Sequence, residues 1–180
     1  MRVSELASRP GLCWLMPPAR RFYGIMVCLL LASLSTVVAA IWLGYPEMGL
    51  LPWVGVVFGG IVLLMMVLPR NWQRWRLAEL AWDDEHLYLL NGGDDKALAL
   101  PRSALVGMTR DRKVGHDGQW LDFSLDLALG AETLAATTAL LRLTREGTHE
   151  VEPGVYRFGF KRAWHGRRAL GEILASLQPA

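Results

Sequence analysis

The sequence predicts a membrane-spanning α-helical hairpin followed by a mainly β domain of the α+β class that ends in a helix. Three observations support this fold class. Residues 22–69 contain no Lys or Arg and a single acidic residue, Glu47. Residues 77–160 alternate apolar and polar side chains in short runs, which is the period of β-strands. Residues 161–178 lack Pro and gather apolar side chains on one helical face.

The uncharged stretch holds two apolar runs, residues 22–43 and 48–68, of 22 and 21 residues. At about 1.5 Å per residue, each run can cross a hydrocarbon core of about 30 Å. We therefore expect a two-helix transmembrane hairpin over residues 22–69, with the lipid bilayer as a partner. A cleaved secretory signal is the alternative, because Arg20 and Arg21 precede the first run. That run is longer than the usual apolar core of such a signal.

Positive charges flank the expected hairpin and are absent from its connecting loop. Four Arg precede the first run, and Arg70, Arg74 and Arg76 follow the second. Because positively charged flanks stay in the cytoplasm, we expect a multi-pass protein of the cell inner (plasma) membrane with both termini cytoplasmic. Residues 1–21 are then a cytosolic N-terminal segment, and residues 70–76 a basic juxtamembrane linker. Four tryptophans stand where interfacial anchors are expected: Trp42, Trp53, Trp72 and Trp75.

Small side chains recur every four residues along both runs. Such stripes let two helix backbones approach closely in lipid. We expect the two faces to meet within the hairpin; the alternative is that they bind another membrane protein or a second copy of the chain. The residues are Gly24, Cys28, Ala32, Thr36 and Ala40 in the first run, and Gly55 and Gly59 in the second.

Residues 77–180 are expected to form the cytosolic domain. The clearest alternation covers residues 119–129, where every second residue from Leu121 to Leu129 is apolar. Seven short strands with turn residues between them favour an antiparallel sandwich or a partly open barrel. Residues 131–138 are ambiguous, because their Ala and Leu content also suits a helical turn. The other six strands are expected at residues 77–82, 87–91, 97–100, 105–110, 139–144 and 155–160.

Strands followed by one amphipathic C-terminal helix give the outline of pleckstrin-homology-like (PH-like) domains. Two N-terminal spans, a basic juxtamembrane segment and the sequence Leu-Ala-Trp-Asp-Asp-Glu-His-Leu-Tyr at residues 80–88 add to this outline. The chain resembles small bacterial membrane proteins that carry a PH-like domain of the YcxB-like type. The resemblance rests on architecture over most of the chain. It implies a PH-like seven-stranded sandwich at residues 77–180 and a scaffold or regulatory role.

Basic residues gather near the start of the expected C-terminal helix, where cations oppose the helix dipole. With the arginines of the linker, they are candidates for contact with anionic lipid headgroups or a partner, at about 1 kcal/mol for each charge near the surface. A solvated face is the alternative, with Arg168 and Glu172 as an i,i+4 ion pair. The candidate residues are Arg70, Arg74, Arg76, Arg157, Lys161, Arg162, Arg167 and Arg168.

No motif for catalysis, metal binding or nucleotide binding accompanies these features, so we expect no enzyme activity, no metal and no cofactor. The acidic runs at residues 83–85 and 94–95 are interpreted as turn caps. Residues 70–180 carry fifteen charges of each sign, which argues against nucleic acid as a partner. We expect a non-enzymatic interaction or regulatory protein. The alternative is an accessory subunit of a larger membrane complex assembled through its transmembrane helices.

Overall fold

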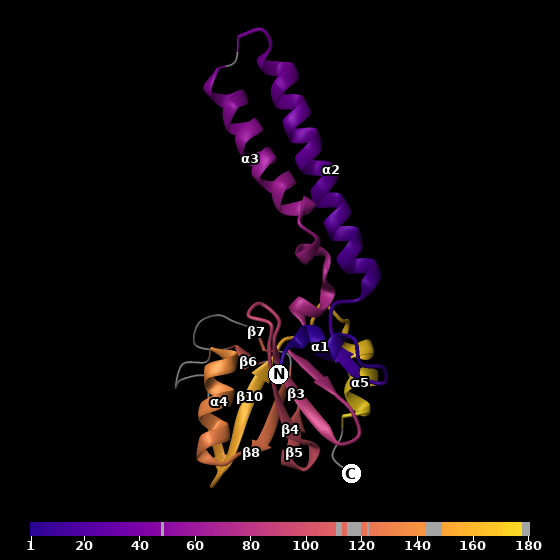
Figure 1. The fold of residues 1–180 in the computed structure, drawn as a ribbon, viewed down its shortest axis with the longest axis vertical. Coiled ribbons are helices and arrows are strands. Elements are labelled where there is room, and N and C mark those ends of the chain that lie inside the picture. Colours follow the sequence, from indigo (N-terminus) through magenta and orange to yellow (C-terminus); the bar gives the residue numbers. More distant parts are fainter. Residues whose placement is uncertain (48, 111–112, 115–119, 122, 143–148, 178–180) are drawn as a thin grey trace. The chain divides into compact units, whose positions relative to one another are not determined.

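The computed structural model describes residues 1–47, 49–110, 113–114, 120–121, 123–142 and 149–177. The chain divides into two compact units (Figure 1). The hairpin unit comprises residues 19–74, and the globular unit comprises residues 1–18 together with residues 75–180. The globular unit contains two four-stranded antiparallel sheets. The predicted fold class is therefore confirmed in its coarse form, an apolar helical hairpin plus a mainly β domain.

The hairpin unit consists of α2 (Ala19–Gly44) and α3 (Leu50–Val67), which lie side by side (Figure 1). At about 1.5 Å per residue, they are about 39 Å and 27 Å long. Both are long and apolar enough to cross a membrane, and most of their surface is exposed. The two predicted runs are thus confirmed as helices. α2 begins three residues before the predicted start at Phe22, while Met48 lies outside the described residues.

The two helices contact each other through the glycines of α3. A Cβ atom built at Gly59 would lie 2.7 Å from the Val37 Cγ2 atom and 3.1 Å from the Ser33 carbonyl oxygen. A Cβ atom at Gly55 would lie 2.9 Å from the Ala40 Cβ atom. Gly55, Gly59 and Ala40 therefore lie where the two helices approach each other.

The rest of the predicted stripe lies elsewhere on α2. Four of its members are exposed in the hairpin unit: Gly24, Cys28, Ala32 and Thr36. With 3.6 residues per turn, a strict spacing of four drifts around a helix by about 40° per step, so a stripe that contacts α3 at Ala40 winds away from it. Residues that are spaced alternately four and three apart stay on one face of a helix. The residues of α2 that contact α3 have this spacing: Ser33, Val37 and Ala40.

The first sheet has the order β1-β2-β3-β4 and the second the order β5-β8-β10-β9. The strands of the first sheet are β1 (Cys13–Leu15), β2 (Leu80–Trp82), β3 (His86–Asn91) and β4 (Lys96–Pro101). Those of the second are β5 (Leu105–Thr109), β8 (Phe123–Ala128), β9 (His149–Glu152) and β10 (Val155–Phe160), and β6 (Lys113–Val114) pairs with β7 (Trp120–Leu121). The described strands exceed the predicted seven because β1, β6 and β9 were not predicted and the run at 119–129 contains both β7 and β8, which more than offsets the one predicted run, at 139–144, that overlaps α4.

The first sheet includes a strand that precedes the hairpin unit in sequence. β1 pairs antiparallel with β2, so that Leu15 lies opposite Leu80 and Cys13 opposite Trp82. Residues 1–18 are therefore part of the globular unit, whereas the sequence predicted a separate segment over residues 1–21. The predicted linker at residues 70–76 is divided between the two units after Arg74.

The first sheet is buried on both faces. Along β3, Leu87 and Leu89 enter the core between the sheets, while Tyr88 and Leu90 point to the opposite face. The helix α1 (Val3–Ala7) covers that opposite face. This second cluster also contains Val3, Leu6, Ala78, Ala81 and Ala97.

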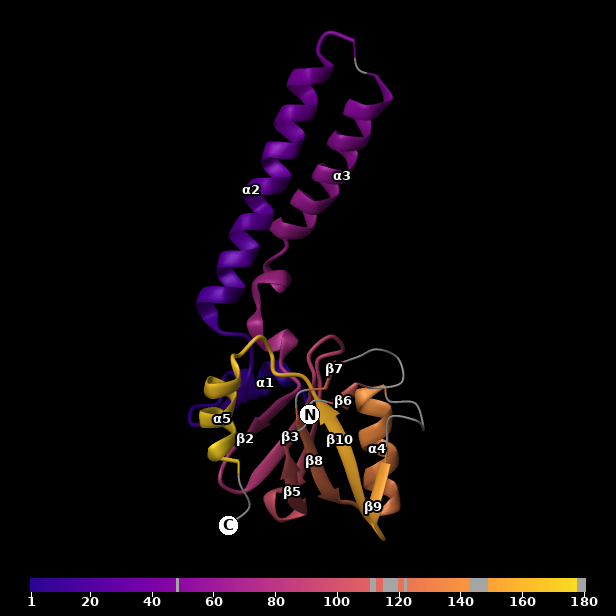
Figure 2. The ribbon, with the colours of Figure 1, turned by 180° about the vertical axis from the view of Figure 1, so that it is seen from behind.

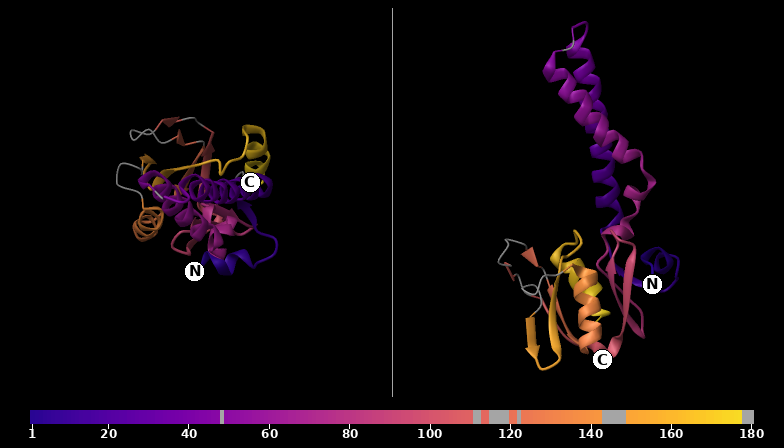
Figure 3. Two further views of the ribbon diagram at one scale, coloured as in Figure 1. Left: turned by 90° about the horizontal axis from the view of Figure 1, so that it is seen from above. Right: turned by 60° about the vertical axis from the view of Figure 1, so that its left-hand side comes forward.

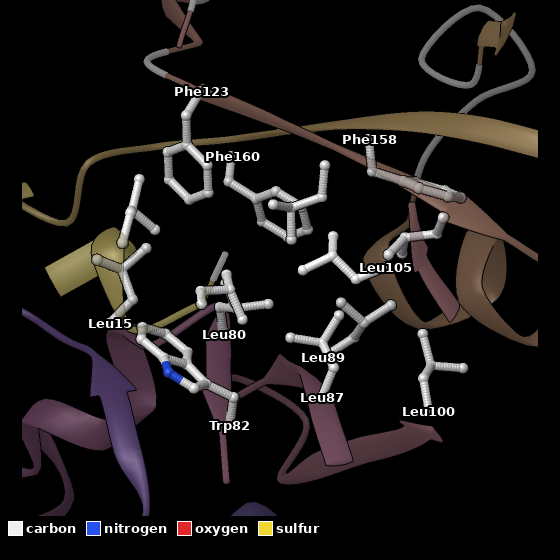
Figure 4. Close-up of a cluster of buried hydrophobic side chains, with 14 of the residues drawn as sticks. Leu15, Leu80, Trp82, Leu87, Leu89, Leu100, Leu105, Phe123, Phe158 and Phe160 are labelled. Atoms are coloured by element: carbon white, nitrogen blue, oxygen red, sulfur yellow. The ribbon is translucent and has the colours of Figure 1, made fainter. Parts of the chain in front are cut away.

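The main core lies between the two sheets and α5 (Arg167–Ala175), and Figure 4 shows most of its large side chains. The rings of Phe123 and Phe160 stack there with their centroids 5.5 Å apart. Leu170 and Leu174 enter the core from α5, which confirms an amphipathic closing helix. The helix is shorter than the predicted residues 161–178.

The helices α4 (Ala131–Leu141) and α5 lie on opposite sides of the sheets (Figures 1 and 2). In the side view of Figure 3, α4 stands between the first sheet and β10. The strand predicted at residues 139–144 is wrong for residues 139–141, which form the last turn of α4. The high helix propensity of Ala and Leu explains this result, and the helical alternative holds for residues 131–138. Residues 143 and 144 lie outside the described residues.

Replacing Leu6 with Ala tests whether residues 1–18 belong to the globular unit. Leu6 is fully buried, so Leu6→Ala is expected to lower the free energy of unfolding of that unit by about 2–4 kcal/mol. Leu77→Ala is the matched control, because 48% of Leu77 is exposed. Urea denaturation of the full chain, followed by pulse proteolysis, gives the measurement. Equal stability of the two variants would show that the N-terminal segment does not pack on the sheet.

Replacing Gly59 with Leu tests the contact between α2 and α3. The new side chain would overlap Val37 and the backbone of Ser33, so Gly59→Leu is expected to destabilise the hairpin unit by about 1–3 kcal/mol. Gly60→Leu is the matched control, because nothing lies within 4 Å of a Cβ atom at Gly60. Stability is read from helix content during a titration with sodium dodecyl sulfate. Indistinguishable midpoints for the two variants would contradict this helix contact.

Candidate binding site

The eight basic residues singled out from the sequence are divided between the two units. Arg70 and Arg74 belong to the hairpin unit. The Arg74 guanidinium lies 5.8 Å from the centre of the Tyr23 ring, which stacks on Trp72 with a centroid distance of 6.4 Å. These contacts hold Arg74 against aromatic rings at the base of its own unit, where a cation attracts the ring face.

Arg157 is held in a bidentate ion pair with Asp126. Its Nε and Nη2 atoms donate to the two carboxylate oxygens at 2.6 and 2.8 Å. The two side chains are only 24% and 13% exposed, and they face each other across β10 and β8. Paired charges of this geometry satisfy each other's hydrogen bonds. Arg157 therefore has a structural role in the second sheet.

Two of the basic residues belong to α5, and one of them forms an ion pair within the helix. Arg167 and Arg168 are exposed in the first turn of the helix. The Arg168 Nε atom lies 3.2 Å from the Glu172 Oε1 atom, which is the i,i+4 pair expected from the sequence. Arg162 is exposed on the segment between β10 and α5. An exposed pair of this kind contributes only a few tenths of a kcal/mol, about 0.3–0.5.

Arg76 and Lys161 come together in a pocket of about 460 Å³ within the globular unit. Four parts of the chain line it: the residues before β2, the turn between β3 and β4, the end of α4, and the end of β10. The wall also contains Arg142, which the sequence did not single out. The pocket thus collects three cationic side chains from three separate segments, which we call the basic pocket.

Hydrogen bonds join α4 to the turn between β3 and β4 on one side of the basic pocket. The Asn91 amide donates to the Leu140 carbonyl oxygen at 2.9 Å and to the Asp94 carboxylate at 3.2 Å. The Arg142 Nη2 atom donates to both Asp94 oxygens, at 2.6 and 2.7 Å. The charge of Arg142 is therefore balanced by Asp94 within the wall.

On the neighbouring wall, the backbone of Arg76 passes very close to the turn between β3 and β4. A Cβ atom at Gly92 would lie 2.3 Å from the Arg76 carbonyl oxygen, so only glycine allows this approach. The Arg76 Nη2 atom donates to the Gly93 carbonyl oxygen at 3.0 Å, and the guanidinium lies 5.6 Å from the centre of the Trp75 ring. The contacts with Gly92 and Gly93 thus fix the position of Arg76 in the pocket wall.

Glu79 is a half-buried carboxyl group in the wall of the basic pocket. Burial raises the pKa of this carboxyl above its usual value, and a hydrogen bond from the Lys161 backbone N–H and the charge of Lys161 oppose the shift. The hydrogen bond is long, at 3.3 Å. Among the described residues, the Lys161 ammonium group itself donates no hydrogen bond. The Lys161 charge, which acts on Glu79, also lies in the wall of the pocket.

The sequence carries a signal for the unusual position of Glu79. Glu79 is the only charged residue in the otherwise apolar run of residues 77–82. A carboxyl group in an apolar strand must point either to solvent or into a cavity. The role of Arg142 had no comparable signal, because it depends on where α4 ends.

The described residues contain no group of three or more His, Cys, Asp or Glu side chains that could hold a metal ion. Asp83 serves as a turn cap, as the sequence predicts. Its carboxylate accepts hydrogen bonds from the backbone N–H groups of Glu85 and His86, at 2.9 and 2.6 Å, and from the Tyr88 hydroxyl at 2.9 Å.

Comparison of the chain with protein families, with curated proteins and with solved structures finds no match. The PH-like resemblance therefore stays a prediction.

Replacing Glu79 with Gln is expected to stabilise the globular unit at neutral and alkaline pH. Because the folded-state pKa of Glu79 is raised, its contribution to stability is complete below the unfolded-state pKa and is lost as pH rises through the folded-state pKa. The variant removes this loss. Thermal unfolding of the full chain in detergent at several pH values between 4 and 8, compared with wild type, gives the measurement. Parallel pH profiles for the two proteins would contradict the raised pKa.

Proposed function

We propose that the chain is an integral protein of the bacterial inner membrane whose globular unit is a PH-like, non-enzymatic interaction or regulatory module in the cytoplasm. The observation that carries this proposal is the exposed apolar surface of the hairpin unit. Large apolar side chains such as Leu51, Phe58 and Leu64 are 84%, 67% and 72% exposed. A contiguous apolar surface of this extent is expected to be covered by lipid.

The pairing of β1 with β2 supports a topology with both termini on one side. Residues 1–18 and 75–180 form one folded unit, so the two ends of the chain must share a compartment when that unit is assembled. The arginines on both flanks of the hairpin unit favour the cytoplasm for this compartment.

The binding role rests on the basic pocket. A concave site with apolar walls and a few converging polar groups is typical of ligand binding. We infer that the module binds a ligand.

A second candidate function is that of an accessory subunit in a larger membrane complex. The observation that favours it is the part of the small-residue stripe left exposed after α2 packs on α3, at Gly24, Cys28 and Ala32. Small residues on a lipid-exposed face permit close contact with another transmembrane helix. A stoichiometric partner that co-purifies in mild detergent and is lost in Ala32→Leu would favour this second function over the first.

The two native cysteines allow a direct test of the membrane topology. Cys13 is exposed in the globular unit and Cys28 lies within α2. In spheroplasts expressing the full chain, a membrane-impermeant maleimide is expected to leave Cys13 unlabelled in the Cys28→Ser variant until the membrane is permeabilised. In the Cys13→Ser variant, Cys28 is expected to stay unlabelled even then, because lipid surrounds it.

A cysteine in the loop between α2 and α3 gives the control. In a chain lacking both native cysteines, Glu47→Cys is expected to react in intact spheroplasts, since Glu47 is exposed at the opposite end of the hairpin unit from its two flanks. Labelling of Cys13 in intact spheroplasts would reverse the topology. Labelling of Cys28 in permeabilised but native membranes would contradict membrane insertion.

A further inference from the structure

The charges of the basic pocket do not cancel. Arg142 is matched by Asp94, whose two oxygens both accept its hydrogen bonds. Within the lining, the acidic group that remains beside Arg76 and Lys161 is Glu79. Asp95 lies outside the lining, where it interacts electrostatically with Arg76 and accepts hydrogen bonds from the Ser4 backbone N–H and hydroxyl, both at 2.8 Å. Two cations against one half-buried carboxyl group make the pocket attractive to an anion.

The lining of the basic pocket also contains apolar side chains. Leu77, Leu90, Leu140, Leu141 and Phe160 contribute to the lining. Phe160 and Leu90 are almost completely buried and so form a rigid floor, while Leu140 and Leu141 end α4. A ligand that fits this site carries a charged group for the cations and an apolar group for the leucines.

We propose that the basic pocket binds a phosphate ester, with its phosphate between Arg76 and Lys161 and its apolar group against the end of α4. An arginine presents a planar array of donors that suits the oxygens of a phosphate, and a lysine adds a mobile point charge. The approach of the Arg76 backbone to Gly92 and the hydrogen bond of Arg76 to Gly93 hold the guanidinium in place. Lys161 follows β10 directly, so its backbone is fixed while its side chain can adjust to the ligand.

Glu79 makes this binding depend on pH. Its carboxylate, when ionised, repels a bound phosphate; when protonated, it can donate a hydrogen bond to a phosphate oxygen. An anion in the pocket therefore favours the protonated form, and affinity rises as pH falls. The other charged groups that line the pocket are Arg76, Asp94, Arg142 and Lys161, and of these Lys161 interacts directly with Glu79.

The phosphate ester has two possible sources, a soluble metabolite or a lipid headgroup, which share the chemistry that the pocket recognises. This inference deepens the proposed binding role and rests on it only in treating the globular unit as a binding module. It does not require a particular membrane topology, so the titration below and the cysteine labelling above can fail independently.

Titration of the full chain with phenyl phosphate tests the proposal. In micelles of an uncharged detergent, isothermal calorimetry is expected to show saturable binding of phenyl phosphate and weaker binding of inorganic phosphate, which lacks the apolar group. Benzyl alcohol, which lacks the charge, is expected not to bind at the same concentrations. Absence of saturable phenyl phosphate binding, or equal binding of benzyl alcohol, would overturn the proposal.

Two variants, each lacking one positive charge, test whether the ligand binds in the basic pocket. Lys161→Gln is expected to weaken phenyl phosphate binding about ten-fold, the effect of losing one charge-assisted hydrogen bond. Arg167→Gln is the matched control, because Arg167 is exposed on α5 and does not line the pocket. Lys161 is also exposed, so neither variant is expected to unfold the chain. Equal weakening by both variants would show binding to net charge and would overturn the assignment to the pocket.

A probe of constant charge isolates the role of Glu79. Benzenesulfonate stays singly charged where phosphate changes its protonation, and its affinity for wild type is expected to fall as pH rises from 5 to 8. In Glu79→Gln the affinity is expected to be independent of pH and higher than wild type at pH 8. The same pH dependence in both proteins would overturn the role of Glu79.

Nanodiscs distinguish the two sources of the ligand. If the ligand is a lipid headgroup, phosphatidic acid in phosphatidylcholine nanodiscs competes with phenyl phosphate and lowers its apparent affinity. If it is a soluble ester, the affinity is the same in nanodiscs with and without phosphatidic acid. Either outcome supports the phosphate site once the Lys161→Gln effect has been found.

Discussion

The pairing of β1 with β2 is the contact on which the rest of the structure depends. It joins residues before the first apolar helix to residues after the second, with Leu15 opposite Leu80. Closing a loop of this length has a large entropic cost if the loop is flexible, but α2 and α3 are rigid helices that already contact each other. The strand pair and the helix pair therefore support each other. Without the strand pair, the first sheet would have β2 as its edge and residues 1–18 would have no partner strand.

Burial on both faces of the first sheet follows from this arrangement. Residues 1–18 bring α1 as well as β1, and α1 covers the face that the second sheet leaves open. Small side chains on that face, Ala81 and Ala97, let a short helix approach closely. A helix of five residues is not stable alone, so α1 depends on this packing. The Ser4 backbone N–H and hydroxyl donate to the Asp95 carboxylate in the turn before β4. Just before α1, the Met1 carbonyl oxygen accepts a hydrogen bond from the Ala97 N–H of β4. These hydrogen bonds anchor α1 to the sheet.

Local patterns predicted those elements whose structure is set by nearby residues. The apolar runs predicted α2 and α3, and alternation around Phe123 and Leu125 predicted β8 with its correct buried face. β1 was not predicted because three residues are too few to show an alternating pattern, and its partner strand lies far along the chain.

The stripe through Gly24 followed a spacing of four residues, which does not stay on one face of a helix. Arg157 looked available because Asp126, its partner, lies on a strand that only the sheet register brings opposite. The basic pocket could not be predicted from the sequence for the same reason, because Arg76 and Lys161 come together only when the chain has folded.

The basic pocket and the strand pair share one short stretch of chain. Arg76 and Glu79 immediately precede β2, and the Glu79 carbonyl oxygen accepts the Leu90 N–H at 2.9 Å, which extends the pairing of β2 with β3 into the pocket wall. A ligand that binds only the folded pocket stabilises it by RT ln(1 + [L]/Kd), and this free energy is shared by every contact that must form with the pocket. Those contacts include the start of β2 and, through β2, its pairing with β1. For the proposed ligand, occupancy of the pocket and formation of the pairing between β1 and β2 would therefore favour each other, because such linkage is reciprocal.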